Sequence, residues 1–400
     1  MKSNHDTVYY KELNSFTRKY LVTNPPKPLS NGEILKFNNE YSRVLSEFCE
    51  LLLYHKKIAI YVYGENIPLV MLLNLFGTKG VEALFEQEAI EFVFSEPEVM
   101  YLIDNISGVL PLVNSTPTSL AHSDPEKSIE MGFAWKRNSL SKRIQRGIVK
   151  KAANAYRIPN IIHGADAIEL CYESYKKNEL LIYGLPNTKQ LVELDINERA
   201  KLCSVANTCN ELAIMSEFNY DAHNLASLHE IYNEYTLKNL HRAKVIEAST
   251  DKIFELEGLP DIRQLIQKNI LTPQDIILIR DSRDFIKFNK WLNETVDTAD
   301  FVNISKEYLS AIQNTKGIFD SNIGKGIRNA SLYVASAVIG GMLGGVEGTI
   351  SGIGVGTLLA KASEIGISLL DMYVLDKITK GWNPKFYFDK VIEPRIEKLS

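Results

Sequence analysis

The chain has 400 residues, of which 45% are hydrophobic and 24% are charged, and its formal net charge is -4 at pH 7. This composition is typical of folded globular domains and excludes a largely disordered chain, and the length is sufficient for about two or three separate cores. The slightly negative charge disfavours a protein that coats nucleic acid with its whole surface. The first residues, MKSNHDTVYYKELNSF, contain no apolar run, so we predict no secretory signal peptide and expect a cytoplasmic location.

The cysteines indicate a reduced protein. They are Cys49, Cys171, Cys203 and Cys209, and no two of them form a CxxC pair. Cys203 and Cys209 lie within an apolar pattern of helical period, which is typical of buried thiols. We therefore expect no disulfide and no structural zinc site. We also predict no cofactor.

Residues 1–57 are predicted to form an N-terminal helical segment that begins with an irregular stretch of about 30 residues. The prolines of NPPKPLSNGE interrupt any helix, and Ser30 followed by Glu33 is a typical helix start. From Ile34 to Tyr54 the apolar residues recur with a helical period, which predicts one packed helix.

Residues 58–165 are predicted to form a small α/β unit that includes a basic helix. The run Ile58–Tyr63 is apolar throughout, as expected of a buried strand, and Asn66 can cap the helix that follows. Ile90–Phe94 and Val99–Ile103 are further strand candidates, so the order of elements predicts a partly parallel sheet. The loop GEN after the first strand is a common ligand position in such folds. Neither GxGxxG nor GxxxxGK(S/T) occurs there, so nucleotide binding at this loop is not predicted.

His122 and Asp124 are the candidate catalytic residues. They lie at the end of a loop, where a histidine can act as a general base oriented by a carboxylate, or where both side chains can bind a metal. Apart from His122, the stretch also has a purely structural explanation, because Asp124 or Ser123 can cap a helix whose first residue is Pro125. The sequence leaves both interpretations open.

The segment from Met131 to Ala165 contains basic residues and no acidic residue. Six of these basic residues are candidate anion-binding positions: Lys136, Arg137, Lys142, Arg143, Arg146 and Lys150. Arg143, Arg146 and Lys150 recur at helical spacing with apolar residues on another face, which predicts an amphipathic basic helix. Such a helix binds phosphates of nucleic acid or of anionic lipid. The alternative is a solvated face that pairs with acidic residues elsewhere in the fold.

Residues 166–315 are predicted to form a helical domain. The short run LLIYG (Leu180–Gly184) is one further strand candidate in it. Phe285, Phe288 and Trp291 recur on one helical face, and we interpret this aromatic stripe as core.

Residues 316–400 contain the most unusual feature of the sequence. Between Ser331 and Ala360 the only charged residue is Glu347, and glycines recur in steps of four at Gly340, Gly344, Gly348, Gly352 and Gly356. Residues four apart on a helix share a face, so this glycine array predicts a smooth groove in which a second helix packs closely. Each glycine inside a helix costs about 1 kcal/mol relative to alanine, so the row requires compensation from such packing.

Two arrangements of the glycine array are open. A single helix over this stretch is about 45 Å long and spans a hydrocarbon core of about 30 Å, with Glu347 protonated, paired or facing water at mid-membrane. A hairpin that turns at Glu347 instead predicts a buried soluble resting state, with insertion as an activated state. The tail aromatics that follow, including Trp382 and Tyr387, suit either a membrane interface or a tail folded over a helical core.

The predicted fold class is therefore α+β and predominantly α-helical, with a small N-terminal α/β unit, a helical middle and a C-terminal glycine-rich helix or helical hairpin. The predicted function is a membrane-associated effector or assembly protein, pore-like or toxin-like in type, at the inner face of the cell membrane. The alternative is a soluble, hydrolase-like enzyme that acts on a phosphate-bearing substrate or nucleic acid. The expected partners are anionic lipid or nucleic acid at the basic helix and further copies of the chain at the glycine face.

Overall fold

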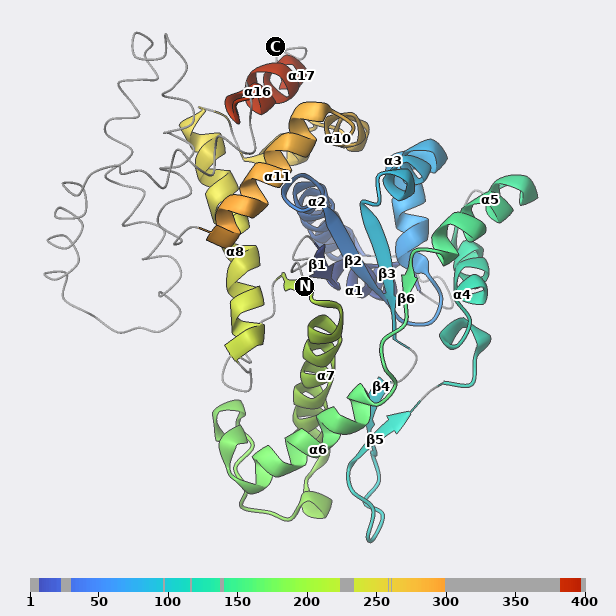
Figure 1. The fold of residues 1–400 in the computed structure, drawn as a ribbon. Helices are drawn as coiled ribbons and strands as arrows, with labels where there is room; N and C mark the ends of the chain where they lie inside the picture. Colours follow the sequence, from blue (N-terminus) through green and yellow to red (C-terminus); the bar gives the residue numbers. More distant parts are fainter. Residues whose placement is uncertain are drawn as a thin grey trace, which may run out of the picture. The chain divides into compact units, whose positions relative to one another are not determined.

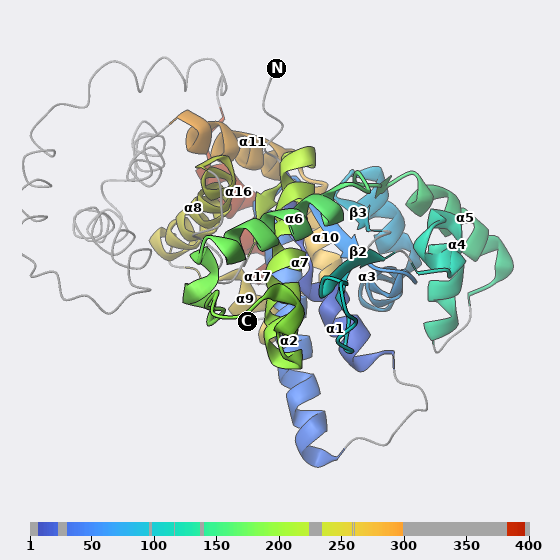
Figure 2. The same cartoon turned by 90° about the horizontal axis from the view of Figure 1, so that it is seen from below.

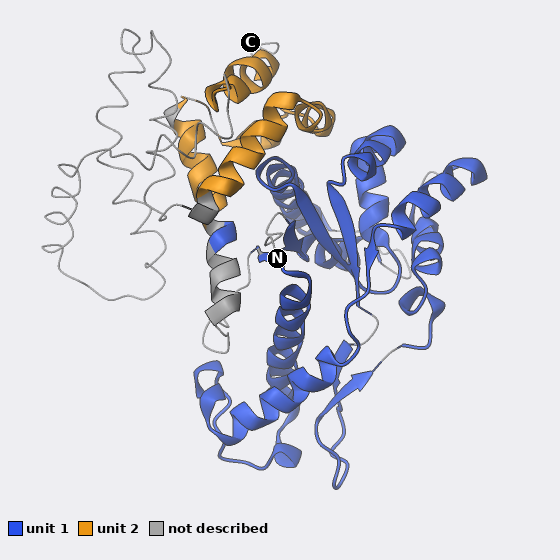
Figure 3. Ribbon diagram, viewed as in Figure 1, with its two compact units in different colours: residues 1–243 blue, residues 244–400 orange. Residues whose placement is uncertain are grey.

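The computed structural model describes residues 7–22, 30–95, 98–115, 117–136, 140–223, 234–257, 259, 261–298 and 382–396. The chain divides into two compact units, residues 1–243 and 244–400, and the boundary falls within helix α8 (Glu234–Leu256; Figure 3). Helices predominate and a small parallel sheet lies in the first unit, which confirms the predicted α+β, mainly helical class (Figure 1). The glycine array, Glu347 and Arg137 lie outside the described residues.

Five parallel strands form the central sheet of the first unit, in the order β6-β3-β2-β1-β7. The strands are β1 (Thr7–Tyr10), β2 (Lys57–Val62), β3 (Ile90–Phe94), β6 (Tyr156–Arg157) and β7 (Asp221–Ala222). The register places Ile58 of β2 beside Val8 on one side and Ile90 on the other. Because the strands are parallel, their carboxyl ends meet at one edge of the sheet, which is where open α/β sheets bind ligands.

The helical elements of the first unit are α1 (Glu12–Tyr20), α2 (Asn31–Tyr54), α3 (Ile67–Glu86), α4 (Pro125–Gly132), α5 (Lys142–Ala153), α6 (His163–Lys176) and α7 (Ile196–Phe218). Short 3-10 turns are η1 (Leu120–His122), η2 (Phe133–Trp135), η3 (Glu179–Tyr183) and η4 (Leu191–Glu193). Two predicted helix starts are confirmed. Ser30 and Glu33 form a reciprocal capping box at α2, and the Asn66 side chain accepts a hydrogen bond from the Leu69 N–H at α3.

Helices cover both faces of the sheet. Tyr9, Ala59 and Val93 point from β1, β2 and β3 into a core shared with α6 and α7, and Figure 2 shows these two helices crossing in front of the strands. Tyr10 points to the opposite face, where its ring lies 6.1 Å from that of Phe48 in α2. Because neighbouring side chains along a strand point to opposite faces, Tyr9 packs against one helical layer and Tyr10 against the other.

The N-terminal stretch has more structure than the sequence predicted. The expectation that it is irregular is wrong for β1 and α1, because Val8, Tyr9 and Tyr10 are buried in the centre of the sheet. A strand of four residues is too short to show a period of its own, and its position depends on pairing with β2 and β7.

Two other strand predictions have different outcomes. The strand predicted at Val99–Ile103 exists as β4 (Glu98–Tyr101), but it pairs antiparallel with β5 (Leu112–Ser115) in a separate two-stranded sheet. The strand predicted at Leu180–Gly184 is wrong, because η3 occupies this stretch. Asn178 and Gly184 both adopt left-handed backbone conformations at the two ends of η3, and this closes the chain into a tight turn.

The second unit is a helical assembly around aromatic side chains. Its elements besides the end of α8 are α9 (Ile262–Gln267), α10 (Pro273–Arg280), α11 (Arg283–Thr298), α16 (Lys385–Tyr387), the π-helical turn η7 (Phe388–Ile392) and α17 (Glu393–Ile396). The rings of Phe288 and Tyr387 stack with centroids 4.5 Å apart, and the Trp382 indole donates to Asp284 at 2.8 Å. The predicted aromatic stripe is therefore core, and the described part of the tail is folded onto it.

Candidate functional site

The carboxyl end of β2 brings together side chains from three distant elements. The strand ends at Val62 and continues into the loop that contains Gly64 and Glu65. Arg18 of α1 donates to the carbonyl oxygens of Tyr63 and Glu65, and its Nη1 lies 3.0 Å from the Glu65 carboxylate. The predicted ligand loop is thus bonded to Arg18, which belongs to a helix that precedes β2 in the chain.

His122 packs directly against this loop. Its ring stands edge-on to that of Tyr63, with centroids 4.5 Å apart. Gly64 has a left-handed φ of +67°, and a Cβ placed there would come within 2.7 Å of the His122 Nε2. Glycine is therefore required at this position for both its backbone conformation and the close approach of the imidazole. We call Arg18, Tyr63, Glu65 and His122 the His122 cluster.

The environment of His122 favours the neutral form of its imidazole. The side chain is 9% exposed, and its Nδ1 has no hydrogen-bond partner among the described residues. Burial lowers the pKa of His122, Arg18 lowers it further, and Glu65 and Glu98 act in the opposite direction. Burial also raises the pKa of Tyr63, with Glu98 contributing in the same direction. A neutral imidazole beside an arginine can accept a proton from water or from a hydroxyl group.

Asp124 occupies a structural position. It is the N-cap of α4, where its Oδ1 accepts hydrogen bonds from the backbone N–H groups of Glu126 (2.8 Å) and Lys127 (3.2 Å), and Pro125 is the first helical residue. No hydrogen bond joins Asp124 to His122 in the described part of the chain. The structure therefore contains the helix start that the sequence left as the alternative, and a catalytic role of Asp124 stays a prediction.

Hydrogen bonds within the protein hold the loop of Gly64 and Glu65 in place and use the N–H groups at the start of α3. The Ser128 hydroxyl donates to the Gly64 carbonyl, and the Asn66 Nδ2 donates to the Tyr156 hydroxyl at 2.8 Å. The Ile67 N–H donates to the Glu65 carbonyl, and Pro68 has no N–H. Because these amide groups already have partners within the protein, the start of α3 does not offer a cradle of free N–H groups for a phosphate.

From β1, the strands β2, β3 and β6 are added on one side of the sheet and β7 on the other. The strand order therefore reverses between β1 and β7, and such a reversal is a second place where α/β folds bind ligands. The buried Glu47 lies there, and its carboxylate accepts hydrogen bonds from Tyr10 at 3.0 Å and lies 2.9 Å from the His223 Nε2. Burial acts to raise the pKa of Glu47, but the bond and charge of His223 outweigh it, and the pKa is lowered. These polar groups satisfy one another. Within the described residues, no group of three or more His, Cys, Asp or Glu side chains is suited to hold a metal.

The predicted basic helix is α5, capped by Ser141. Ile148 and Ala152 are buried, and four cations lie on the opposite, exposed side: Lys142, Arg143, Arg146 and Lys150. With 3.6 residues per turn, these four positions fall within about 100° of the helix circumference. None of them makes a hydrogen bond or ion pair with a described residue. We call these four residues the basic stripe.

The other predicted anion-binding residues do not belong to the stripe. Lys136 donates to the Asn74 side chain at 2.6 Å, which ties the segment before α5 to α3. Arg137 lies outside the described residues, as do the glycine array and Glu347. Ile144 is 40% exposed on α5, but it lies about 150° around the helix from the centre of the stripe, on the side of the buried Ile148.

Sequence reasoning missed Arg18, Tyr63 and Glu65 as members of the His122 cluster. Glu65 belongs to the loop after a predicted parallel strand, and that position is a signal that could have selected it. Arg18 carried no such signal, because its helix was expected to be irregular chain.

No protein-family model matches the sequence, and no curated protein or solved structure is significantly similar to it. Two groups of described residues are therefore the candidates for function: the His122 cluster at the sheet edge and the basic stripe on α5.

Proposed function

We propose that the protein is a membrane-associated effector or assembly protein. In this proposal the basic stripe binds anionic lipid headgroups, and the glycine array packs helices closely and inserts in the bilayer. The observation that carries the proposal is the set of cations on one face of α5 that make no ion pair with a described residue, in a segment with no acidic residue from Met131 to Ala165.

The charge of the stripe is sufficient for reversible adsorption. A lysine or arginine near an anionic membrane surface contributes about 1 kcal/mol, so four of them contribute about 4 kcal/mol. This corresponds to roughly a thousandfold accumulation at the surface. Stable attachment needs a further apolar contribution, as it does for other peripheral proteins.

Lipid is favoured over nucleic acid by two features. The stretch from Ser331 to Ala360 has Glu347 as its only charged residue and, as a helix, is long enough to cross a bilayer. The formal charge of the whole chain is -4, which disfavours broad contact with a nucleic-acid backbone. Of the described helices, α3 is long and apolar enough to cross a membrane, but 56% of its apolar window is buried inside the protein. The proposed contact is therefore assigned to α5.

Co-sedimentation with lipid vesicles tests this proposal. The protein should bind vesicles that contain phosphatidylglycerol and ignore vesicles of phosphatidylcholine alone. Replacing all four stripe residues by glutamine should abolish most of the binding at low salt and remove its salt dependence.

A matched control makes the same charge change at cations that are paired with acids: Lys19, Lys127, Lys176 and Lys290 replaced by glutamine. This variant should bind like the wild type. Equal losses in both variants would attribute the effect to net charge, and tight binding of duplex DNA without vesicle binding would replace lipid by nucleic acid as the partner.

The second candidate function is a hydrolase-like enzyme that acts on a phosphate-bearing substrate. The observation in its favour is the neutral His122 beside Arg18 at the carboxyl edge of a parallel sheet. His122 would accept a proton from water, and Arg18 would contact the phosphate. Hydrolysis of phosphate esters by the wild type, lost in His122→Gln and retained in Asp124→Asn, would select this function, and inactivity of the wild type on both mono- and diesters would remove it.

A further inference from the structure

The loop that joins β4 and β5 exposes a cluster of aliphatic side chains. Figure 1 shows this loop extending beyond the ends of the two strands. Four large apolar residues in it are exposed: Ile103 (69%), Ile106 (51%), Val109 (39%) and Leu110 (44%). Such a concentration of exposed apolar side chains marks a surface that contacts another apolar phase. We call residues 102–111 the apolar loop.

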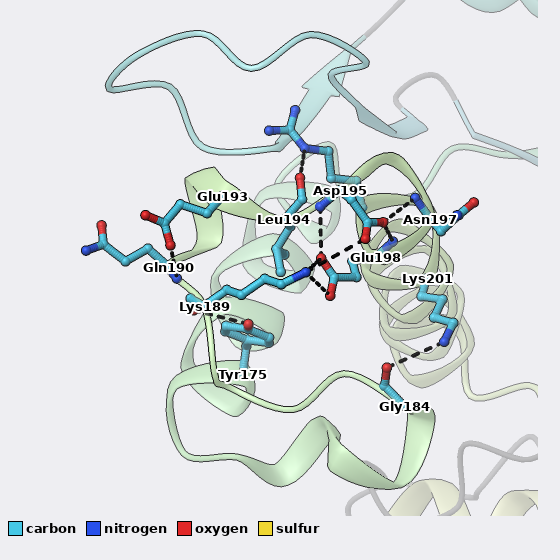
Figure 4. Close-up of polar contacts among 11 residues, drawn as sticks. Tyr175, Gly184, Lys189, Gln190, Glu193, Leu194, Asp195, Asn197, Glu198 and Lys201 are labelled. Atoms are coloured by element: carbon cyan, nitrogen blue, oxygen red, sulfur yellow. Dashed lines mark hydrogen bonds and ion pairs between the residues drawn. The ribbon is translucent and has the colours of Figure 1, made fainter.

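A buried arginine holds the base of this loop. Arg199, near the start of α7, is 2% exposed, and its Nη1 donates to the carbonyl oxygens of Leu102 (2.7 Å) and Asp104 (3.0 Å). The Arg199 Nε donates to the Leu194 carbonyl in the connection between α6 and α7. Figure 4 shows this connection, which is itself braced by an ion pair between Lys189 and Glu198. One guanidinium therefore fixes the loop to a well-bonded part of the first unit.

The two strands behind the loop are also fixed. The Leu112 N–H donates to the Tyr172 hydroxyl of α6 at 2.9 Å. The Val99 carbonyl accepts from the Asn207 side chain of α7 at 2.9 Å. Since the hairpin is bonded on its helix-facing side, the aliphatic residues are exposed because the fold presents them, and not because the hairpin is detached.

We propose that the apolar loop inserts into the hydrocarbon of a lipid bilayer. This inference rests on the proposed membrane function and adds to it the apolar contact that the basic stripe lacks. The turn at the tip brings the inserting side chains together, because the Val109 N–H donates to the Ile106 carbonyl and Gly108 has a left-handed φ of +77°.

A bilayer suits this loop better than a protein groove. The segment LIDNISGVLP contains no aromatic residue and no arginine, the types that supply most binding energy in protein interfaces. Acyl chains adapt to a convex shape and accept branched aliphatic groups in any orientation, whereas a protein partner needs a complementary groove. Asp104, the one charged residue of the loop, has its main chain held at the base by Arg199.

A fluorescent label on the loop tests insertion directly. Cys49, Cys171, Cys203 and Cys209 are all buried, so the folded Ile106→Cys variant should react with a thiol-specific nitrobenzoxadiazole dye at the loop. Adding vesicles that contain phosphatidylglycerol should shift the emission to shorter wavelength and increase its intensity. The matched control is Ile286→Cys, which labels a residue 58% exposed in α11 of the second unit and should show no shift. Unchanged emission at the loop in vesicle-bound protein would overturn the inference.

A second variant separates this inference from the membrane function itself. Replacing Ile103, Ile106 and Val109 by serine changes exposed side chains and should leave the fold intact. The variant should still bind anionic vesicles at low salt through the stripe, but at high salt its binding should fall at least tenfold below that of the wild type. If the variant and the wild type bind vesicles equally well at high salt, the loop does not insert, but the proposed membrane function is not contradicted. Absence of vesicle binding by the wild type at every salt concentration defeats both.

Discussion

The imidazole of His122 stands edge-on to the phenol ring of Tyr63, with ring centroids 4.5 Å apart. One residue comes from a 3-10 turn and the other directly follows a central strand. The contact places the imidazole against Gly64 at the carboxyl edge of the sheet. The imidazole is buried there, and its Nδ1 has no hydrogen-bond partner among the described residues. Protonation of His122 is therefore unfavourable in the folded state.

The first prediction concerns the effect of pH on stability. Because the pKa of His122 in the folded protein lies below the ordinary value of 6.5, the unfolded chain binds more protons between the two values. Stability from this group is complete above about pH 6.5 and is lost as the pH falls through the folded pKa. His122→Gln, which does not titrate, should flatten this loss. Urea denaturation at a series of pH values measures it, and parallel curves for both proteins would contradict it.

The second prediction concerns Gly64. Gly64→Ala places a Cβ within 2.7 Å of the His122 ring in a left-handed backbone conformation, so we expect destabilisation by about 1–3 kcal/mol. The control is Gly147→Ala in α5, where no atom lies within 4 Å of the new Cβ. It should stabilise the protein by roughly 0.5–1 kcal/mol through helix propensity. Chemical denaturation compares the two, and equal effects would show that His122 moves aside freely.

The third prediction concerns Arg199. Arg199→Met removes a buried guanidinium that donates to the carbonyl groups of Leu102 and Asp104 at the base of the apolar loop and to that of Leu194, and should cost about 2–4 kcal/mol. Amide hydrogen exchange should rise in residues 98–115 before it rises in the central sheet. Arg143→Met, at an exposed cation without a described partner, should change the free energy of unfolding by less than about 0.5 kcal/mol. A similarly small effect at Arg199 would mean that water replaces the guanidinium without loss.

The fourth prediction concerns the glycine array, which lies outside the described residues. Gly344→Leu or Gly348→Leu should disturb folding or membrane association far more than Val346→Leu. A leucine on the helix face that carries the glycines blocks close approach of a second helix. Expression level, vesicle binding and cross-linking of copies measure the difference. Equal tolerance at the three positions would make the spacing accidental.

The fifth prediction concerns Glu347, also outside the described residues. If it forms the turn of a hairpin, Glu347→Cys should react rapidly with a membrane-impermeant thiol reagent in the soluble protein, where the four native thiols are buried. Protection of this cysteine both in lysate and in membranes would rule out the turn. Glu347→Leu should raise membrane partitioning, since a carboxylate is costly in hydrocarbon.

What the sequence determined by itself is local. The starts of α2, α3 and α4 were readable because Ser30, Asn66 and Asp124 bond to backbone N–H groups no more than three residues away. The strand β2 was readable because burial on both faces requires an apolar run such as Ile58–Val62, and β3 is apolar except for Glu91. The basic stripe followed from helical period and charge alone.

What only the tertiary structure decided depends on contacts between distant segments. β1 is held in the sheet by pairing with β2 and β7, and Arg18 reaches Glu65 only after α1 packs beside β2. The exposure of the apolar loop also required the fold, because aliphatic residues at these positions could equally have been core. Local hydrogen bonds and periodicity act over a few residues and leave a record in the sequence. The pairing of distant elements minimises the free energy of the whole chain, and no short stretch records it.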